Sequence, residues 1–307
     1  MHNDTTTSVQ STKTVSKVGP FEKLLNFLKD FSKDKFATVA LIVFGALVLS
    51  SIFAGFVAPH DPLQMDLIAR LQPPVWSEGG SWKYIFGTDL LGRDILSRCI
   101  YGGRMSLGIG LAVILIGGTF GSLMGLLSGY LGGRFDAILM RYIDFQISIP
   151  YFLLALTIMA AIGPGTKNLI IVLSIGSWPL FARYARSIMI SLRKQVFIEA
   201  ARVAGGKEVS IVTRHVLPNI LSPLVTLTTL ELSRIVLTEA TMSYLGMGVR
   251  APTPAWGLMV QEAHDYLMRA NWAVTTPGVF IMVTALTINI FATRLRISTD
   301  PLQRGKH

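Results

Sequence analysis

Long apolar stretches alternate with shorter polar ones along most of this chain. Six of the apolar stretches reach the roughly 20 residues that a helix needs to cross the hydrocarbon core of a bilayer. The pattern therefore predicts an all-α polytopic membrane protein with six transmembrane helices. The expected spans are residues 36–58, 105–130, 142–163, 168–190, 219–245 and 272–293.

The segment before the first span differs from the rest of the chain. Residues 1–19 are rich in Ser, Thr and Lys, so they bury too little apolar surface to offset the entropy of ordering, and we expect a disordered tail. In residues 20–35 apolar side chains recur at helical spacing, with charged ones on the other side. This pattern predicts an amphipathic helix on the membrane surface, with packing on a soluble partner as the alternative.

Composition and charge support a membrane topology with both termini in the cytoplasm. Only 15% of the 307 residues are charged, against about 25% in soluble domains. If six spans alternate, nineteen Lys and Arg side chains fall on one side and eight on the other, with Arg234 inside a span. The positive-inside rule places the richer side in the cytoplasm. The net charge of +10 therefore largely reflects this topology, and we expect no nucleic-acid partner.

This topology divides the chain into domains. Residues 36–293 form the transmembrane domain, which includes an external loop at 59–104 and a cytoplasmic loop at 191–217. Residues 294–307 form a cytoplasmic tail. The second span carries glycines at intervals of four, which predicts a flat helix face for close packing, with chance spacing as the alternative. These glycines are Gly117, Gly121, Gly125 and Gly129.

A polar segment, residues 195–217, separates the fourth and fifth spans. Residues 199–202 favour a helix, and Gly205-Gly206 supplies the left-handed stop that a helix C-terminus prefers. A second helical run is expected over residues 207–215, ending before Pro218. The product is a compact helix-turn-helix outside the membrane. Short helices move as rigid bodies, so this segment suits the transmission of motion from a soluble partner.

The same segment resembles the signature loop of the membrane subunits of binding-protein-dependent ABC importers. His215 stands where many members have isoleucine, and the peptide-transporter branch often has histidine there. The matching residues are Glu199, Ala200, Ala201, Gly205, Leu217 and Pro218. Further matching motifs are Phe86-Gly87-Thr88-Asp89, Leu91-Gly92-Arg93-Asp94, Ser97-Arg98, Gly103-Arg104-Met105-Ser106-Leu107, Tyr244-Leu245-Gly246-Met247-Gly248 and Pro254-Ala255-Trp256-Gly257.

Together these motifs, over about residues 36–301, look like the C-type subunit of dipeptide, oligopeptide and nickel importers. The resemblance implies a type I importer permease fold in a bacterial inner membrane and a translocation path shared with a second permease subunit. It also implies two cytoplasmic ATPase subunits, which bind ATP and Mg, and an extracytoplasmic solute-binding protein received by the external loop and residues 247–270. In this reading Glu199 contacts the ATPase, the Ala pair permits close packing and Gly205 shapes the turn.

Three charged residues lie inside the fifth span, where each charge costs at least about 2.5 kcal/mol on insertion scales. Glu231 and Arg234 are three residues apart, so they are neighbours on one helix face. Glu239 follows on the same span. These residues are candidates for the translocation path, where they would contact peptide termini; a structural ion pair between helices is the alternative. Arg141 and Asp144 at the start of the third span are expected to form an interface pair.

The external loop offers only weak candidates for other chemistry. His60 with Asp61, Asp89 and Asp94 has irregular spacing for a metal site, and Asp89 is better explained by a capped turn.

Cys99 is the one cysteine, so a disulfide within the chain is excluded. The sequence has no phosphate loop, His-Glu-x-x-His motif or nucleophile elbow. We therefore expect no enzyme activity and no cofactor or metal in this chain. Candidate interfacial anchors are Trp76, Trp82, Trp256 and Trp272.

Two other classes of protein remain as alternatives. A self-contained secondary transporter or channel would use the charges of the fifth span and would need no cytoplasmic helix-turn-helix. An intramembrane enzyme would use Glu231 or Glu239, for which no partner residues are evident in the sequence. Neighbouring genes for a second permease, for ATPases with a phosphate loop and for a secreted binding protein would favour the importer.

Overall fold

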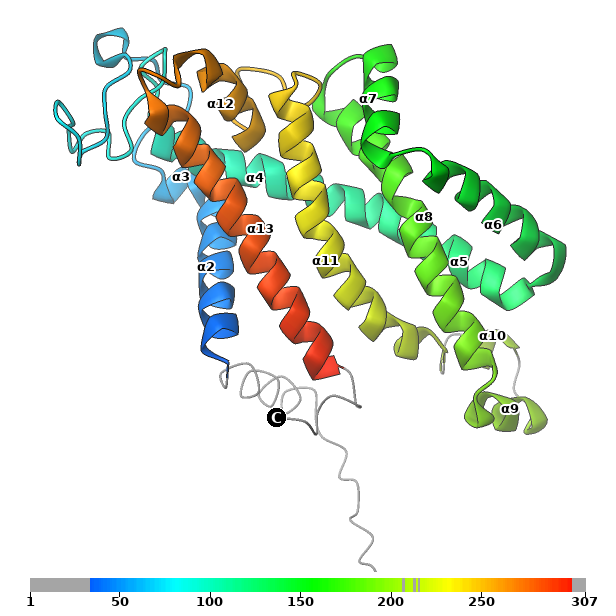
Figure 1. Ribbon diagram of the computed structural model, residues 1–307. Coiled ribbons are helices and arrows are strands. Elements are labelled where there is room, and N and C mark those ends of the chain that lie inside the picture. Colours follow the sequence, from blue (N-terminus) through cyan, green and yellow to red (C-terminus); the bar gives the residue numbers. More distant parts are fainter. Residues whose placement is uncertain (1–33, 206–207, 212–213, 215, 300–307) are drawn as a thin grey trace, which may run out of the picture.

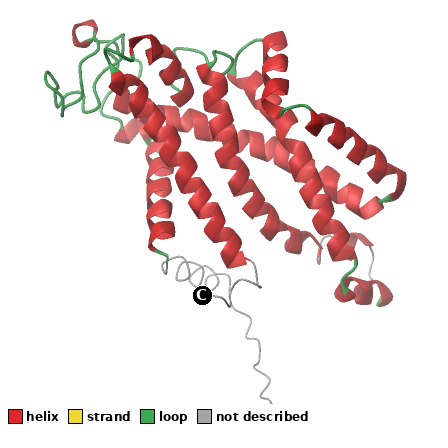
Figure 2. Cartoon of the chain, viewed as in Figure 1, coloured by secondary structure: helices red, strands yellow, loops and turns green. Residues whose placement is uncertain are grey.

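The computed structural model describes residues 34–299 except 206, 207, 212, 213 and 215. The described part is helical, and loops gather mainly at one end (Figure 2). The expected tail at 1–19, almost all of the amphipathic helix at 20–35, and residues 300–307 lie outside this part. Five continuous helical stretches are long and apolar enough to cross a membrane: α2 (Lys35–Ile52), Ile95–Leu131, α8 (Thr166–Arg193), α11 (Leu217–Tyr244) and α13 (Asn271–Thr299).

The expected third span is not one straight helix. It consists of α6 (Gly133–Ser148) and α7 (Tyr151–Ile162), which meet at an angle of 84°. Ile149 has extended backbone angles because the ring of Pro150 disfavours the helical conformation in the preceding residue. The bent pair raises the number of spans to as many as six, so the expected six-helix fold is confirmed. The helix of the third span begins at Gly133, nine residues before its expected start at residue 142.

The second span begins earlier than its hydropathy indicates. α4 (Ile95–Val113) starts ten residues before the expected boundary, at Asp94, whose side chain accepts a hydrogen bond from the Ser97 amide at 2.9 Å. This contact is a typical helix N-cap. The span continues through a π-helical turn, Ile114–Gly118, into α5 (Thr119–Leu131). The expected external loop therefore contains the first turns of α4.

The glycine seam in this span is confirmed. α5 packs along α8 (Figure 1), and a Cβ atom added at Gly121 or Gly125 would lie 2.2 Å from the Trp178 carbonyl oxygen or 2.0 Å from the Ala182 carbonyl oxygen. Gly117 and Gly129 also face α8 at short distance. No side chain fits between the two backbones at these positions, so the close approach depends on glycine.

The two ends of the helical bundle differ (Figure 1). One end, which we call the loop end, holds α3 (Ala54–Val57), η1 (Leu67–Ala69), α12 (Trp256–Ala263), η4 (His264–Tyr266) and the junction of α7 with α8. The opposite end, which we call the α9 end, holds α9 (Val196–Val203), α10 (Glu208–Ile211), the start of α2 and the end of α13. The described ends of the chain and α9 thus lie together, as the expected topology requires.

Candidate functional site

The α9 end carries the helix-turn-helix that the sequence predicts between the fourth and fifth spans. α9 contains Glu199 and Ala200, together with the backbone of Ala201. The Ala204 amide donates to the Ala200 carbonyl at 2.9 Å, and Gly205 follows at φ +79°. A left-handed residue at this point ends the helix and satisfies its last carbonyl groups. The predicted stop at Gly205 is therefore where the chain turns.

Among the described side chains of α9, one is buried against the bundle. Ile198 is 1% exposed and belongs to a cluster with Met189, Ile211, Val216 and Ile220. By contrast Val196 and Val203 are 80% and 85% exposed, and Glu199 and Ala200 are also exposed. α9 is too short to cross a membrane, so these exposed apolar side chains form a surface of the kind that another protein can cover.

The second half of the segment is described only in part. α10 spans Glu208–Ile211, and Arg214 also has a helical backbone. Residues 207, 212, 213 and His215 lie outside the described residues, so the full extent of the expected helix over 207–215 stays a prediction. Leu217 begins α11 with Pro218 in its first turn, where the missing N–H of proline costs nothing. Both residues are exposed. The matching motif residues that the structure describes thus lie on α9, at its turn and at the start of α11.

The charged residues of the fifth span occupy two different environments. Arg234 donates through Nε to Glu231 at 2.7 Å, and its guanidinium carbon lies 4.7 Å from the ring centre of Tyr151. Both members of this ion pair line an open cavity of about 360 Å³ at the bend between α6 and α7. The intrahelical pair is therefore confirmed, and it faces a cavity rather than lipid alone.

Glu239 lies apart from this cavity. Its side chain is fully buried, and Oε1 accepts a hydrogen bond from Ser243 at 2.8 Å. Ser243 in turn accepts from the Val249 amide at 3.2 Å. Glu239 thus ties the end of α11 to the turn that leads toward α12, and it is absent from the lining of the cavity that holds Glu231 and Arg234.

Arg141 and Asp144 do not form the expected pair with each other. Asp144 instead accepts from Arg183 of α8 at 2.5 Å. Asp136, eight residues before Asp144 on α6, pairs with Arg186, which lies three residues after Arg183 on α8. These contacts hold α6 against α8, so Asp144 does belong to an interface pair, but with a different arginine.

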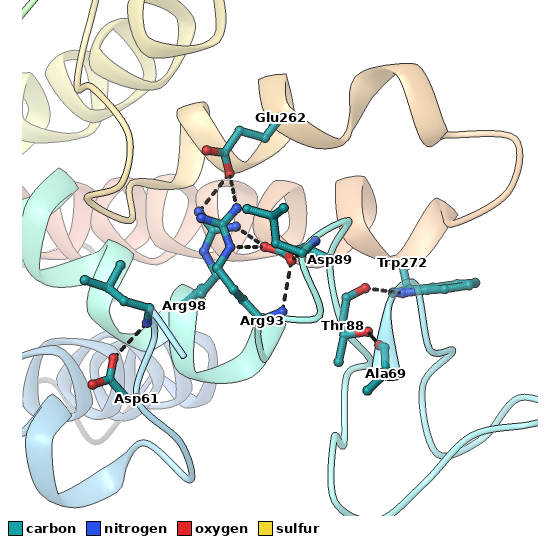
Figure 3. A network of polar contacts seen from close by, with 10 residues as sticks. Asp61, Ala69, Thr88, Asp89, Arg93, Arg98, Glu262 and Trp272 are labelled. Atoms are coloured by element: carbon teal, nitrogen blue, oxygen red, sulfur yellow. Dashed lines mark hydrogen bonds and ion pairs between the residues drawn. The ribbon is translucent and has the colours of Figure 1, made fainter. Parts of the chain in front are cut away.

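The loop end contains a polar cluster that the sequence did not predict (Figure 3). Arg93 pairs with two carboxylates: its Nε lies 2.6 Å from Asp89 Oδ2, and its Nη2 lies 3.0 Å from Glu262 Oε2. Arg98 pairs with the same two carboxylates, and its Nη2 lies 2.8 Å from Glu262 Oε2. We call these four residues the Asp89 network. The side chains of Arg93, Arg98 and Asp89 are at least nine-tenths buried. The network joins the loop, the start of α4 and α12 into one unit. Three of its members stand in motifs noted in the sequence, but Glu262, which is 164 residues from Arg98, has no local signal.

The other residues considered for a metal site in the loop also make structural contacts. Asp61 accepts from the Leu63 amide at 2.8 Å, and His60 lies 3.5 Å from Asp94, the N-cap of α4. In the described residues no three His, Cys, Asp or Glu side chains are grouped so as to hold a metal ion. Trp256 is not an interfacial anchor, because it is 1% exposed and donates to the Cys99 carbonyl at 2.8 Å.

The arrangement of helices matches that of a protein of known structure. A solved structure of the MetNI methionine ABC transporter in inward-facing conformations covers 67% of this chain and 98% of its own, with a TM-score of 0.50 and 22% sequence identity. This chain therefore shares its fold with a chain of that transporter.

Curated relatives match at higher identity over nearly the whole chain. The di/tripeptide transport system permease protein DppC of Pseudomonas aeruginosa is 39% identical over 278 residues, covering 91% of this chain and 92% of the relative. The dipeptide transport system permease proteins DppC of Haemophilus influenzae and Escherichia coli K12 are 37% and 36% identical, covering 92% and 95% of this chain and 96% and 98% of theirs.

Two family descriptions match separate parts of the chain. Residues 24–74 match the N-terminal transmembrane domain of oligopeptide transport permease C. Residues 121–299 match the binding-protein-dependent transport system inner membrane component. The chain has membrane-spanning helices along its length, and these relatives align over more than nine-tenths of it. It is therefore a multi-pass inner membrane protein that belongs to the binding-protein-dependent transport system permeases, the membrane subunits of ABC importers.

Proposed function

We propose that this permease forms, with a second permease subunit, the path of an ATP-driven importer of dipeptides or related small solutes. Two cytoplasmic ATPase subunits would bind ATP and Mg and drive the cycle, and an extracytoplasmic binding protein would deliver the solute to the loop end. The names of the relatives support the dipeptide class. The single observation that carries the coupling role is the surface of α9.

α9 has the features of a helix that another protein holds. It projects from the end of α8 (Figure 1), and only Ile198 among the side chains described on it is buried. Two of its exposed valines would lose their contact with water in a groove on an ATPase, which stabilises the complex by the hydrophobic effect. Glu199 lies exposed on the same short helix and adds a charge for orientation. Movement of the ATPases would then act on α8 and α11, the two long helices that flank this segment.

The same role requires a defined orientation in the membrane. With α9 in the cytoplasm, the described ends of the chain at the α9 end are cytoplasmic as well, and the loop end faces the binding protein. This orientation also places the majority of the Lys and Arg residues inside. Glu231 and Arg234, which line the cavity at the bend of α6 and α7, would then lie on the solute path.

Cysteine labelling tests the proposal, because the chain's one cysteine, Cys99, is fully buried. We expect Val203→Cys to react with a membrane-impermeant maleimide only after cells are permeabilised, and to crosslink to a nucleotide-hydrolysing protein. Trp82→Cys, at an 82% exposed site of the loop end, is the matched control and should react in intact cells. Reaction of Val203→Cys in intact cells would reverse the orientation. Crosslinks that never contain an ATPase would remove the coupling role.

A further inference from the structure

The cavity at the bend of α6 and α7 has one charged wall in mostly apolar surroundings, with Gln146 and Tyr151 as further polar lining residues. Its charged lining residues among those described are Glu231 and Arg234, and its other walls include Ile147, Ile149, Leu154 and Leu180. Charge pairing is stronger where apolar groups displace water. A charged end of a solute that enters this cavity would therefore interact mainly with this pair.

The guanidinium of Arg234 is held in place from two sides. Its Nε and Nη2 lie 2.7 Å and 2.6 Å from Oε2 of Glu231, and its face lies against Tyr151 at 4.7 Å. Tyr151 itself is positioned by α8, because a Cβ atom at Gly176 would lie 1.9 Å from its ring. The arginine therefore loses little conformational freedom when a ligand binds, which favours binding.

One edge of this guanidinium remains open. Nη1 has no hydrogen-bond or ion-pair partner among the described residues, and the side chain of Arg234 is 41% exposed, against 10% for Glu231. A guanidinium edge presents parallel N–H donors that match the two oxygens of a carboxylate. The geometry thus offers a carboxylate the Nη1 side of an arginine whose Nε–Nη2 edge is already paired with Glu231.

We propose that Arg234, positioned by Glu231 and Tyr151, binds the terminal carboxylate of the transported solute. This inference rests on the proposed function and names the chemical group that the path recognises. Glu231 limits the affinity, because a second carboxylate shares the same cation. A transport path needs such moderate binding, since the solute must also leave. The apolar walls would accept side chains of different shape.

The test compares a dipeptide with its C-terminal amide in the complete importer. We would reconstitute the complex in proteoliposomes and measure initial ATP-dependent uptake of dialanine and of dialaninamide. The binding protein would be saturated with each, so that its own preference does not enter the rate. Wild-type protein is expected to transport the free carboxylate about tenfold faster, since a charge-assisted hydrogen bond is lost in the amide. Glu231→Gln with Arg234→Gln should reduce this ratio to about one.

Controls separate recognition from folding. Asp144→Asn with Arg183→Gln removes an ion pair of the same kind that lies outside the cavity lining, and it should keep the tenfold ratio. Tyr151→Leu leaves the Glu231–Arg234 pair in place and should lower the uptake ratio in part. It replaces the Glu231→Gln, Arg234→Gln variant as the test if that variant does not assemble. A wild-type ratio near one, or an unchanged ratio in the cavity variants, would overturn the carboxylate site. Absence of ATP-dependent uptake of both probes by the wild type would instead sink the proposed function on which it rests.

Discussion

At the loop end of the molecule, buried ion pairs connect segments that lie far apart in the sequence, whereas at the α9 end a short helix is attached by one buried isoleucine. Two arginines and two carboxylates join the loop, α4 and α12 in the Asp89 network. Ile198 alone among the described side chains of α9 enters a core cluster. One end is therefore built to keep its shape, and the other presents a surface.

The same contrast appears at two glycines with left-handed backbones. A Cβ atom at Gly92, φ +74°, would lie 1.8 Å from the Asp66 carbonyl oxygen, while a Cβ atom at Gly205, φ +79°, would meet nothing within 4 Å. Both positions require glycine for conformation, but only Gly92 also requires it for space. The turn at Gly92 is closely packed, and the turn after α9 stands open, as a partner-binding element does.

The largest effect is expected for Arg98→Ala. This substitution leaves Glu262 and Asp89 with one arginine between them in a mostly buried site, and breaking a buried ion pair costs about 3–5 kcal/mol. We expect a large fall in the thermal unfolding midpoint of the purified complex. The matched change at the α9 end is Glu199→Ala, which should leave the midpoint unchanged because Glu199 is exposed. Equal midpoints for the two variants would show that the Asp89 network does not stabilise the loop end.

The Asp89 network also marks the limit of what could be predicted from sequence. Hydropathy located the fourth, fifth and sixth spans to within a few residues at their starts, because each begins with a run of twelve or more residues that contains no charged side chain. It placed the start of α4 too late, since Arg98 and Arg104 are polar. Arg98 is tolerated in a buried helix only through carboxylates such as Glu262, which is distant in sequence and close in space.

The candidate site, too, could be predicted from the sequence only in part. The Glu231–Arg234 pair follows from a spacing of three residues on one helix, and the stop at Gly205 follows from local backbone preference. Tyr151 had no such signal, because it reaches Arg234 from another helix across the bend at Pro150. A proline within an apolar run indicates a break but not its angle, so the cavity could not be predicted.

The second prediction compares valine at the two glycines. Gly92→Val combines a left-handed backbone with a clash, and we expect a loss of about 3 kcal/mol in stability. Gly205→Val carries only the backbone strain of about 1–2 kcal/mol, yet it should uncouple ATP hydrolysis from uptake by changing the turn after α9. The measurements are unfolding midpoints, ATPase rate and solute uptake for both variants.

Gly163→Val is the control for this uncoupling. Gly163 has φ +84° and nothing within 4 Å of an added Cβ atom, but it follows α7 at the loop end. It should cost as much stability as Gly205→Val and keep ATP hydrolysis coupled to uptake. Normal uptake by the Gly205 variant would contradict the coupling role of the turn.

The third prediction concerns the anchor of α9. Ile198→Ala removes most of a side chain that is 1% exposed, which costs about 2 kcal/mol or more in a packed site. Because α9 protrudes, this loss should appear as local opening rather than global unfolding. Hydrogen exchange should become faster in α9 with little change in α11. Val203→Ala, at an 85% exposed position, should leave exchange unchanged; equal acceleration in both variants would mean that Ile198 is not the anchor.

The smallest effect is expected at the rim of the loop end, outside the Asp89 network. Hydrogen bonds from Lys83 and Tyr84 hold the pKa of Asp66 below its ordinary value of 3.8. A carboxylate with a lowered pKa stabilises the fold above its ordinary value, and this contribution disappears as the pH falls through the lower folded value. Lys83→Met should therefore lower the unfolding midpoint slightly near neutral pH and not in strong acid. Lys167→Met, at another exposed lysine of the loop end, should show no such pH dependence. If Lys83→Met lowers the unfolding midpoint by the same amount below pH 3.8 as near neutral pH, the lysine acts through packing and not through the Asp66 carboxylate.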